Sequence, residues 1–141
     1  MRRINNISKI LGTIIFSVLF FFSNMTPLYA SSATISVYSS SNKVVVGNTF
    51  TVTVKVKSSS YFGTVELAPS YDKSLFKLTS GSSVLDYGKW KEKTYTYKFK
   101  AISSGSGSIS VKSVSVRDYS TEKEMSLSKG STYVTVITQA Q

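Results

Sequence analysis

The sequence predicts an all-β fold, an antiparallel β-sandwich of seven to nine short strands. Apolar residues recur with a period of two along most of the chain, and no stretch keeps the 3.6-residue period of a helix. Ser, Thr, Val and Tyr, which suit exposed or half-buried strands, dominate together with Lys. Turn signals rich in Gly, Asn and Ser separate the apolar segments at nearly regular spacing. A parallel α/β fold would need helices between its strands, and the sequence offers none.

Two segments alternate most regularly, residues 48–57 and residues 94–101. In each segment the apolar side chains share one face, and Thr and Lys share the other. This alternation indicates a sheet with one dry and one wet side. The residues predicted to face the core here are Phe50, Val52, Val54 and Val56, and Tyr95, Tyr97, Phe99 and Ala101.

Shorter strands are predicted around Ile35, Val44–Val46, Val65–Leu67, Phe76–Leu78 and residues 131–138, with Pro69 ending the third of them. Ile109 and Val111 share one parity, whereas Val114 and Val116 share the other, so we expect a bulge or break near Lys112–Ser113. Turns are expected at residues 47–48, 58–60, 80–83, 103–107 and 129–130.

Residues 1–30 have the three parts of a secretory signal peptide, which we expect to be helical. Arg2, Arg3 and Lys9 form a basic start, and an apolar run follows over residues 10–22. That run of about 13 residues is short of the roughly 20 that span a bilayer, so no stable membrane span is expected after cleavage. We expect cleavage after Ala30, with Ala33 as the alternative, and a secreted or cell-surface bacterial protein whose domain covers residues 31–141. An uncleaved membrane anchor is the other interpretation.

The composition excludes several kinds of chemistry. The chain has no Cys and no His, which rules out Ser-His-Asp triads, Cys-His dyads, imidazole or thiolate metal sites and disulfides. Lys and Arg number 17 against 7 Asp and Glu; three of the basic residues precede residue 31, which leaves 14 basic and 7 acidic residues, or +7, in the predicted domain. Arg117 is the single Arg after residue 30, and the Lys residues are dispersed, so no nucleic-acid partner is expected.

Three segments resemble bacterial cohesin modules. Residues 46–56, Val-Gly-Asn-Thr-Phe-Thr-Val-Thr-Val-Lys-Val, resemble the opening turn and long strand of that family. Residues 63–67, followed by Ser-Tyr-Asp-Lys-Ser-Leu at 70–75, resemble its Tyr-Asp-Pro-Ser-x-Leu segment, with Lys73 where Pro is usual. Residues 95–101 and 105–109 resemble its paired strands with the pattern F-x-A then G-x-x-x-I. The resemblance covers most of residues 34–138.

The resemblance implies a nine-stranded, jelly-roll-like or Ig-like sandwich that acts as a receptor. In true cohesins the partner is a dockerin, a helical module that carries the calcium itself, and in related sandwiches the ligand is a polysaccharide. We therefore expect a non-catalytic module that recognises an extracellular, dockerin-like protein in polysaccharide-degrading or surface assemblies. The alternatives are a carbohydrate-binding module for a polysaccharide or wall glycan, and a structural spacer.

The segment around Trp90 is the main candidate for ligand binding. Trp90 and the neighbouring Tyr87 could stack on a sugar ring, and the flanking lysines could hold an anionic polymer. Alternatively, Trp90 packs inward at one end of the sandwich and the lysines are merely solvated. The same two interpretations apply to the loop aromatic pair that precedes it. The candidate residues are Trp90, Tyr87, Lys89, Lys91, Tyr61 and Phe62.

Tyr71 and Asp72 are expected to form a structural turn, with the ring at a strand end and the carboxylate capping the backbone. Four further acidic residues were considered as calcium ligands or as paired catalytic carboxylates. They lack the closely spaced oxygen ligands of a calcium loop, and a sandwich of this size suggests no deep cleft, so we predict neither a metal, nor a cofactor, nor an enzyme. These residues are Asp86, Asp118, Glu122 and Glu124.

Overall fold

The computed structural model describes residues 31–139, and the predicted signal peptide at residues 1–30 lies outside them. The described residues form eight strands. No helix long and apolar enough to cross a membrane occurs among them. The strands are β1 (Ser32–Ser39), β2 (Lys43–Val45), β3 (Thr49–Ser70), β4 (Phe76–Ser80), β5 (Val84–Ala101), β6 (Gly105–Asp118), β7 (Ser126–Lys129) and β8 (Thr132–Ile137).

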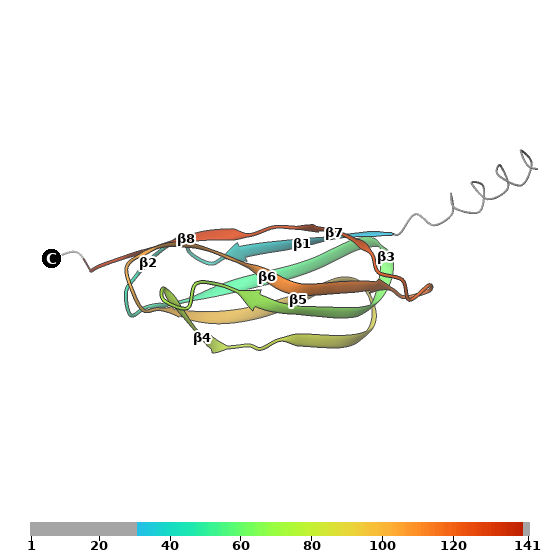
Figure 1. Ribbon diagram of the computed structural model, residues 1–141, viewed down its shortest axis with the longest axis horizontal. Coiled ribbons are helices and arrows are strands. Elements are labelled where there is room, and N and C mark those ends of the chain that lie inside the picture. Colours follow the sequence, from blue (N-terminus) through green and yellow to red (C-terminus); the bar gives the residue numbers. More distant parts are fainter. Residues whose placement is uncertain (1–30, 140–141) are drawn as a thin grey trace, which may run out of the picture. The chain divides into compact units, whose positions relative to one another are not determined.

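The strands form two layers (Figure 1). The long strands β3 and β5 each bend, so that one half of each strand lies in one layer and the other half lies in the second layer. The first layer has the order β7-β1-β3-β5-β4 and uses the amino-terminal half of β3 with the carboxyl-terminal half of β5. The second layer has the order β5-β3-β6-β8-β2 and uses the other half of each long strand. Most pairings are antiparallel, while β1 with β7 and β2 with β8 are parallel. The predicted all-β sandwich is confirmed.

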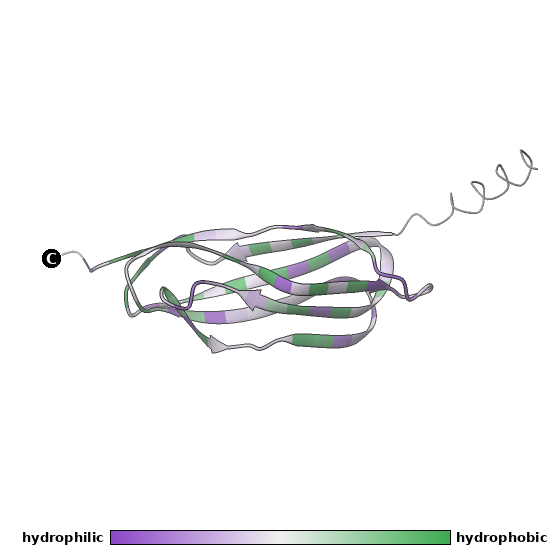
Figure 2. Cartoon of the chain, viewed as in Figure 1, coloured by the Kyte–Doolittle hydropathy of each residue, from purple (hydrophilic) through white to green (hydrophobic). Residues whose placement is uncertain are grey.

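One hydrophobic core lies between the layers and draws on every strand except β7, whose Leu127 packs against it from a half-buried position. Figure 2 shows the alternation of hydrophobic and hydrophilic residues along the strands that produces it. At one end of the core Phe50 stacks on Phe99 with 5.7 Å between ring centroids and meets the edge of Phe76 at 5.6 Å. At the other end the fully buried Phe62 packs against Trp90.

The bend of β3 replaces the turn that the sequence predicts at residues 58–60. Residues 58–61 bulge out opposite Lys91 alone, because Lys57 pairs with Glu92 and Phe62 pairs with Trp90. The chain does not reverse there, so the expectation of a turn is wrong. A second irregularity follows at Gly63, after which the buried side chains fall on odd positions instead of even ones. Because of this change of parity, β3 directs side chains into the core from both layers.

The predicted bulge in β6 is confirmed at Ser113, whose φ of 54° lies in the left-handed region. Glu66 pairs with Ser115 and Ala68 with Lys112, so β6 carries one extra residue there. Consequently Val111 and Val116 both reach the core despite their opposite parity.

Pro69 does not end its strand, contrary to the prediction, because β3 continues to Ser70 and Pro69 pairs with Val111 of β6. On its other side β3 is unpaired beyond the Leu67–Val84 pair. Proline has no N–H to donate, and it is tolerated where one side of the strand is open. Val46 also departs from the prediction: β2 ends at Val45, and Val46 is exposed in the turn before Gly47, whose φ is 94°.

The first described residue is already tied into the domain. The Ser31 hydroxyl donates a 2.7 Å hydrogen bond to Asp118, and the Ser31 carbonyl accepts one of 3.0 Å from the amide of Ser126. Ala33 is buried in the core. Cleavage after Ala33 would remove these contacts. Residues 31–139 include the eight described strands and the whole core cluster, and they belong to one compact unit.

Candidate functional site

Two tyrosines and two lysines gather at one end of the sandwich, where β3 bends and the turn after β6 begins. We call Tyr61, Lys89, Lys91 and Tyr119 the end cluster. The ammonium of Lys89 lies 4.8 Å from the ring centroid of Tyr61 and 5.0 Å from that of Tyr119. The ammonium of Lys91 lies 4.8 Å from the Tyr61 ring. Cation–π attraction therefore holds both ammonium groups over exposed aromatic rings.

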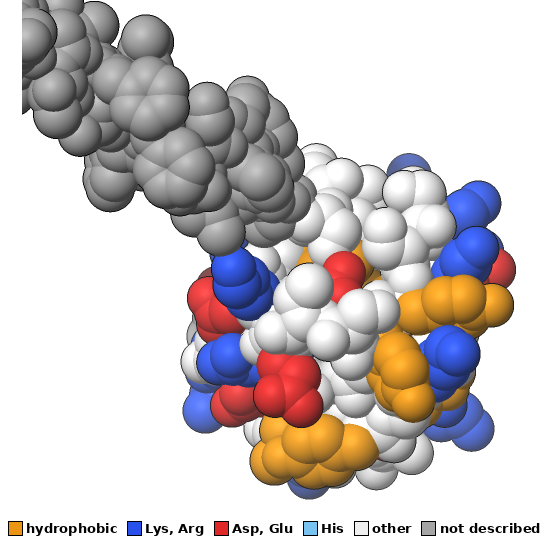
Figure 3. Space-filling model, turned by 90° about the vertical axis from the view of Figure 1, so that its right-hand side faces the viewer, with side chains coloured by type: hydrophobic (Ala, Val, Ile, Leu, Met, Phe, Trp, Pro, Cys, Tyr) orange, Lys and Arg blue, Asp and Glu red, His pale blue; other side chains and the backbone are white. Residues whose placement is uncertain are grey.

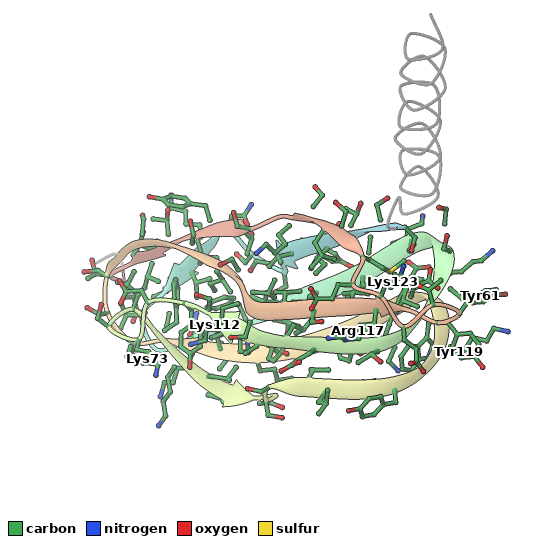
Figure 4. The ribbon with its side chains drawn as sticks, turned by 45° about the vertical axis from the view of Figure 1, so that its right-hand side comes forward. Tyr61, Lys73, Lys112, Arg117, Tyr119 and Lys123 are labelled. Atoms are coloured by element: carbon green, nitrogen blue, oxygen red, sulfur yellow. The ribbon has the colours of Figure 1, made fainter. Side chains whose placement is uncertain are left out.

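The end cluster projects from the sandwich into solvent. Figure 4 shows Tyr61 and Tyr119 side by side at this end, and Figure 3 shows basic side chains beside hydrophobic ones there. A backbone hydrogen bond of 2.9 Å from the Tyr119 amide to the Tyr61 carbonyl fixes the two segments to each other. Tyr119 is not among the residues predicted from the sequence, because it lies in a turn and is 58 positions away from Tyr61 along the chain.

The structure divides the predicted ligand residues into surface and core. Tyr61, Tyr87, Lys89 and Lys91 are exposed, and Tyr87, at 69%, is the most exposed tyrosine within residues 31–139. Phe62 is a correction, because its side chain is fully buried and cannot contact a ligand.

Trp90 is half-buried and packs against Phe62, with ring centroids 6.0 Å apart. Its indole also lies against Gly88, where an added Cβ would come within 2.4 Å of the ring. The ammonium of Lys93 covers the ring at 5.1 Å from its centroid. Trp90 therefore packs against the end of the core, as the second interpretation of this segment expects. The most exposed aromatic rings at this end are those of the tyrosines.

A hollow of about 220 Å³ adjoins the end cluster and shares Tyr119 with it. Tyr87 and Tyr119 contribute aromatic rings, Thr64 a hydroxyl, and Asp118 and Glu122 carboxylates. At Gly63 an added Cβ would lie 3.1 Å from the Tyr119 ring and 3.3 Å from the carbonyl oxygen of Gly88. Glycine is therefore what lets the Tyr119 ring lie close to the strands beneath it.

The acidic residues considered as metal ligands have other partners. Asp118 caps the turn after β6 by accepting hydrogen bonds from the amides of Ser120 and Thr121 at 2.8 and 3.0 Å. The hydrogen bond from Ser31, together with these amides, holds the pKa of Asp118 below its ordinary value. Glu124 lies 3.7 Å from the guanidinium of Arg117. Over residues 31–139 no three acidic side chains converge as a metal site would require.

Tyr71 and Asp72 form a turn between β3 and β4. The Tyr71 ring meets the edge of Phe99 with 4.9 Å between centroids, so it packs against the core. Asp72 accepts hydrogen bonds from the amide and hydroxyl of Ser74, and these bonds lower its pKa. Its carbonyl also accepts from the amides of Leu75 and Phe76 at 3.1 and 3.0 Å. The turn positions the start of β4.

A second hollow region lies on the outer face of the second layer, beside the bulge of β6. Two depressions of about 330 and 360 Å³ meet there and share Ala68, Ser83 and Lys112. We call them together the Lys112 groove. Figure 4 places Lys112 and Lys73 toward the opposite end from Tyr61 and Tyr119. The groove is also lined by the acidic Glu66 and by apolar residues, namely Leu67, Ala68, Pro69, Tyr71, Leu78, Val84 and Leu85.

The fold is that of a cohesin-like β-sandwich. A type II cohesin domain from the cellulosome of Acetivibrio cellulolyticus superimposes with a TM-score of 0.56 at 14% identity, covering 74% of this chain and 95% of that one. The cohesin of a type I cohesin–dockerin complex from Clostridium thermocellum gives 0.57 at 17% identity over 75% and 99%. A CARDB domain from Pyrococcus furiosus, solved with di-metal ions, gives 0.55 at 16% over 79% and 98%.

At these identities the likeness shows the fold alone. No protein-family model matches the chain, and neither does any curated protein. The expected cohesin-like or Ig-like architecture is confirmed, and among the solved structures with this fold are cohesin domains that bind proteins.

Proposed function

We propose that this chain is a secreted or cell-surface, non-catalytic module that binds an extracellular protein partner of dockerin type. The cohesin-like fold supports the proposal, since one structure that it resembles is a cohesin in complex with a dockerin. The docking surface that we propose is the outer face of the second layer, at the Lys112 groove and the adjoining strand β8.

The observation that carries this assignment is the exposure of large apolar side chains on that face. Leu85 of β5 is 59% exposed and Tyr133 of β8 is 61% exposed, and both point outward on the second layer. Protein interfaces are enriched in aromatic residues and depleted in lysine at their centres. The outer face of the first layer shows the opposite composition, rows of threonine and lysine with Tyr38 as its exposed aromatic residue.

The groove offers a partner both an apolar anchor site and a charge. An apolar side chain could pack on Ala68 and Leu85, which are partly uncovered. Lys73 and Lys112 form none of the ion pairs found in residues 31–139, so they are available to carboxylates of the partner. Hydrophobic anchoring with a charged rim is the usual anatomy of such interfaces.

The test is affinity capture with immobilised residues 31–141. Secreted proteins of the source organism are passed over the domain with and without calcium, and the retained proteins are identified by mass spectrometry. We expect calcium-dependent retention of proteins that share one helical module. Retention of no protein at all would overturn the receptor function and leave the structural spacer.

Matched variants locate the docking face. Tyr133→Ala and Tyr38→Ala remove the same side chain from outward positions of the second and first layers, with 61% and 46% exposure in the parent. We expect Tyr133→Ala to weaken retention about tenfold or more, because interface tyrosines often contribute more than 1.4 kcal/mol. Tyr38→Ala should bind as the parent does. The reverse result would place the docking surface on the first layer.

A further inference from the structure

The end cluster carries two cations that no carboxylate in residues 31–139 neutralises. The ion pairs found there join Lys55 with Glu92, Lys93 with Asp86, and Arg117 with Glu124. Lys89 and Lys91 belong to none of them, although they lie two residues apart on one strand. Like charges at this spacing repel each other, and an anion between them would relieve that repulsion. Both ammonium groups lie 4.8 Å from the centroid of the Tyr61 ring, so this one ring holds both lysine side chains at the same end of the sandwich.

The adjoining hollow supplies the complementary chemistry for a sugar ring. Tyr87 and Tyr119 offer flat apolar faces, and the carboxylate of Glu122 and the hydroxyl of Thr64 can hydrogen-bond to hydroxyl groups. Glu122 is exposed and forms none of the ion pairs, so its carboxylate oxygens remain open to a ligand. Within a few side chains the surface thus changes from cationic to acidic, with aromatic rings shared between the two parts.

We propose that this end of the sandwich binds an acidic polysaccharide of the uronic-acid type. Carboxylates of the polymer pair with the ammonium groups of Lys89 and Lys91, a sugar ring rests on Tyr119 and Tyr87, and its hydroxyls bond to Glu122 and Thr64. This site and the Lys112 groove share no lining residue, although Tyr87 and Leu85 are neighbours on the outer face of β5.

The presence of both charge signs favours a saccharide over an acidic peptide. A run of Asp and Glu would be attracted by Lys89 and Lys91 but repelled by Glu122 and Asp118 in the same site. Each sugar of a uronic-acid polymer carries neutral hydroxyls beside its carboxylate, and these hydroxyls can donate hydrogen bonds to Glu122, which the carboxylates of an acidic peptide cannot do. The net charge of +7 over residues 31–141 also favours an anionic polymer at long range.

The experiment is affinity electrophoresis of residues 31–141 in gels containing polygalacturonate, dextran or polyglutamate. We expect retardation by polygalacturonate, weak or no retardation by neutral dextran, and less retardation by polyglutamate than by polygalacturonate. Equal or stronger retardation by polyglutamate would overturn the saccharide assignment in favour of an acidic peptide. Absence of retardation by polygalacturonate would overturn the site itself.

Two lysine pairs provide the matched test of location. Lys89→Ala with Lys91→Ala removes the end-cluster cations, whereas Lys77→Ala with Lys100→Ala removes the same charge from a directly opposed pair on the first layer. We expect the first double variant to weaken polygalacturonate binding about tenfold and the second less than about twofold. Equal losses would show non-specific charge attraction and contradict the proposal.

Tyr119→Ala and Tyr119→Phe separate stacking from the hydroxyl. The ring should be required, so Phe should bind within about twofold of the parent and Ala should lose about tenfold. Equal binding by all three proteins would exclude Tyr119 from the site. Thermal unfolding of each variant establishes that the domain is folded. Variants that lose the glycan but retain the captured protein distinguish this proposal from the docking function, since the two sites share no lining residue.

Discussion

The two outer faces of the sandwich arise from the same alternating pattern, yet they differ in shape and composition. On the first layer the outward residues form aligned rows, such as Tyr38–Thr53–Thr96 across β1, β3 and β5. On the second layer the rows are interrupted at the bulge at Ser113. They are interrupted again beyond Leu67, where β3 no longer pairs with β5. Hollows occur on the second layer where the rows break. A regular sheet therefore gives a wet, even face, and irregularities in pairing produce the concave surface that can take a ligand.

The largest expected effect comes from a buried residue at the bend where β3 passes from one layer to the other. Phe62 lies fully buried at the bend of β3, beside Trp90, whereas its neighbour Tyr61 is exposed. Phe62→Ala should lower the free energy of unfolding by about 3–5 kcal/mol, because it opens a cavity where the layers meet. Tyr61→Ala should lower it by less than about 1 kcal/mol, since only surface contacts are lost. Urea denaturation measures both, and similar losses would contradict the division between core and end cluster.

A smaller effect should be specific to the second layer. Ser113 has a φ of 54°, which β-branched residues adopt at a cost of about 1–2 kcal/mol. Ser113→Val should therefore destabilise the domain by about that amount, while Ser110→Val on the same strand, whose φ is not positive, should change stability little. Thermal unfolding provides the comparison. Equal stability of the two variants would show that the bulge is not maintained as described.

Alkaline pH should weaken the link between the two halves of β5. Tyr95, in the first-layer half, donates a 3.1 Å hydrogen bond to Asp86 in the second-layer half. Burial, and then this bond, raise the pKa of Tyr95 above the ordinary value of 10.0. A raised pKa means that the folded state binds its proton more tightly than the unfolded state. Its contribution to stability is thus complete below about pH 10 and is lost as the pH rises from there toward the folded pKa.

Tyr95→Phe should accordingly lose less stability between pH 8 and pH 11 than the parent does, whereas Tyr38→Phe, at an exposed position, should follow the parent. Melting temperatures across this range provide the measurement. An identical pH dependence in Tyr95→Phe and the parent would contradict the role of this phenol.

The smallest effect concerns the first layer. Lys77 and Lys100 lie directly opposite each other on β4 and β5. Replacing one of two opposed like charges with the opposite charge should stabilise the pair by about 0.2–1 kcal/mol. We expect Lys77→Glu to raise the melting temperature slightly at low salt and to lose this gain in 1 M NaCl. A decrease at low salt would show that these ammonium groups do not repel each other.

The sequence predicted the parts of the fold that depend on local alternation. Apolar residues recur at every second position in Phe50, Val52, Val54 and Val56. Such a strand places its apolar face in the core and its polar face in water, whichever strands lie beside it. The shift of parity between Val111 and Val114 likewise predicted the bulge in β6. The two-layer arrangement could be predicted, because the apolar faces of the strands must be buried against each other.

The parts that depend on long-range pairing were not predictable. Residues 58–60 carry the small polar residues of a turn, yet pairing on both sides of them keeps β3 extended through a bulge. The sequence predicts a strand end at Pro69, because the open side of β3 becomes evident only once β5 is placed. Tyr119 joins Tyr61 through contacts that sequence spacing does not encode, so the end cluster could be predicted only in part.

The most direct test of the account is chemical-shift mapping of ¹⁵N-labelled residues 31–141 with the captured protein partner. The account predicts shifts concentrated in the second layer, at Leu85, Lys112 and Tyr133, with the first-layer rows around Thr53 and Thr96 unchanged. Shifts concentrated in those threonine and lysine rows, with Leu85 and Tyr133 unaffected, would contradict the claim that the irregular face is the docking surface.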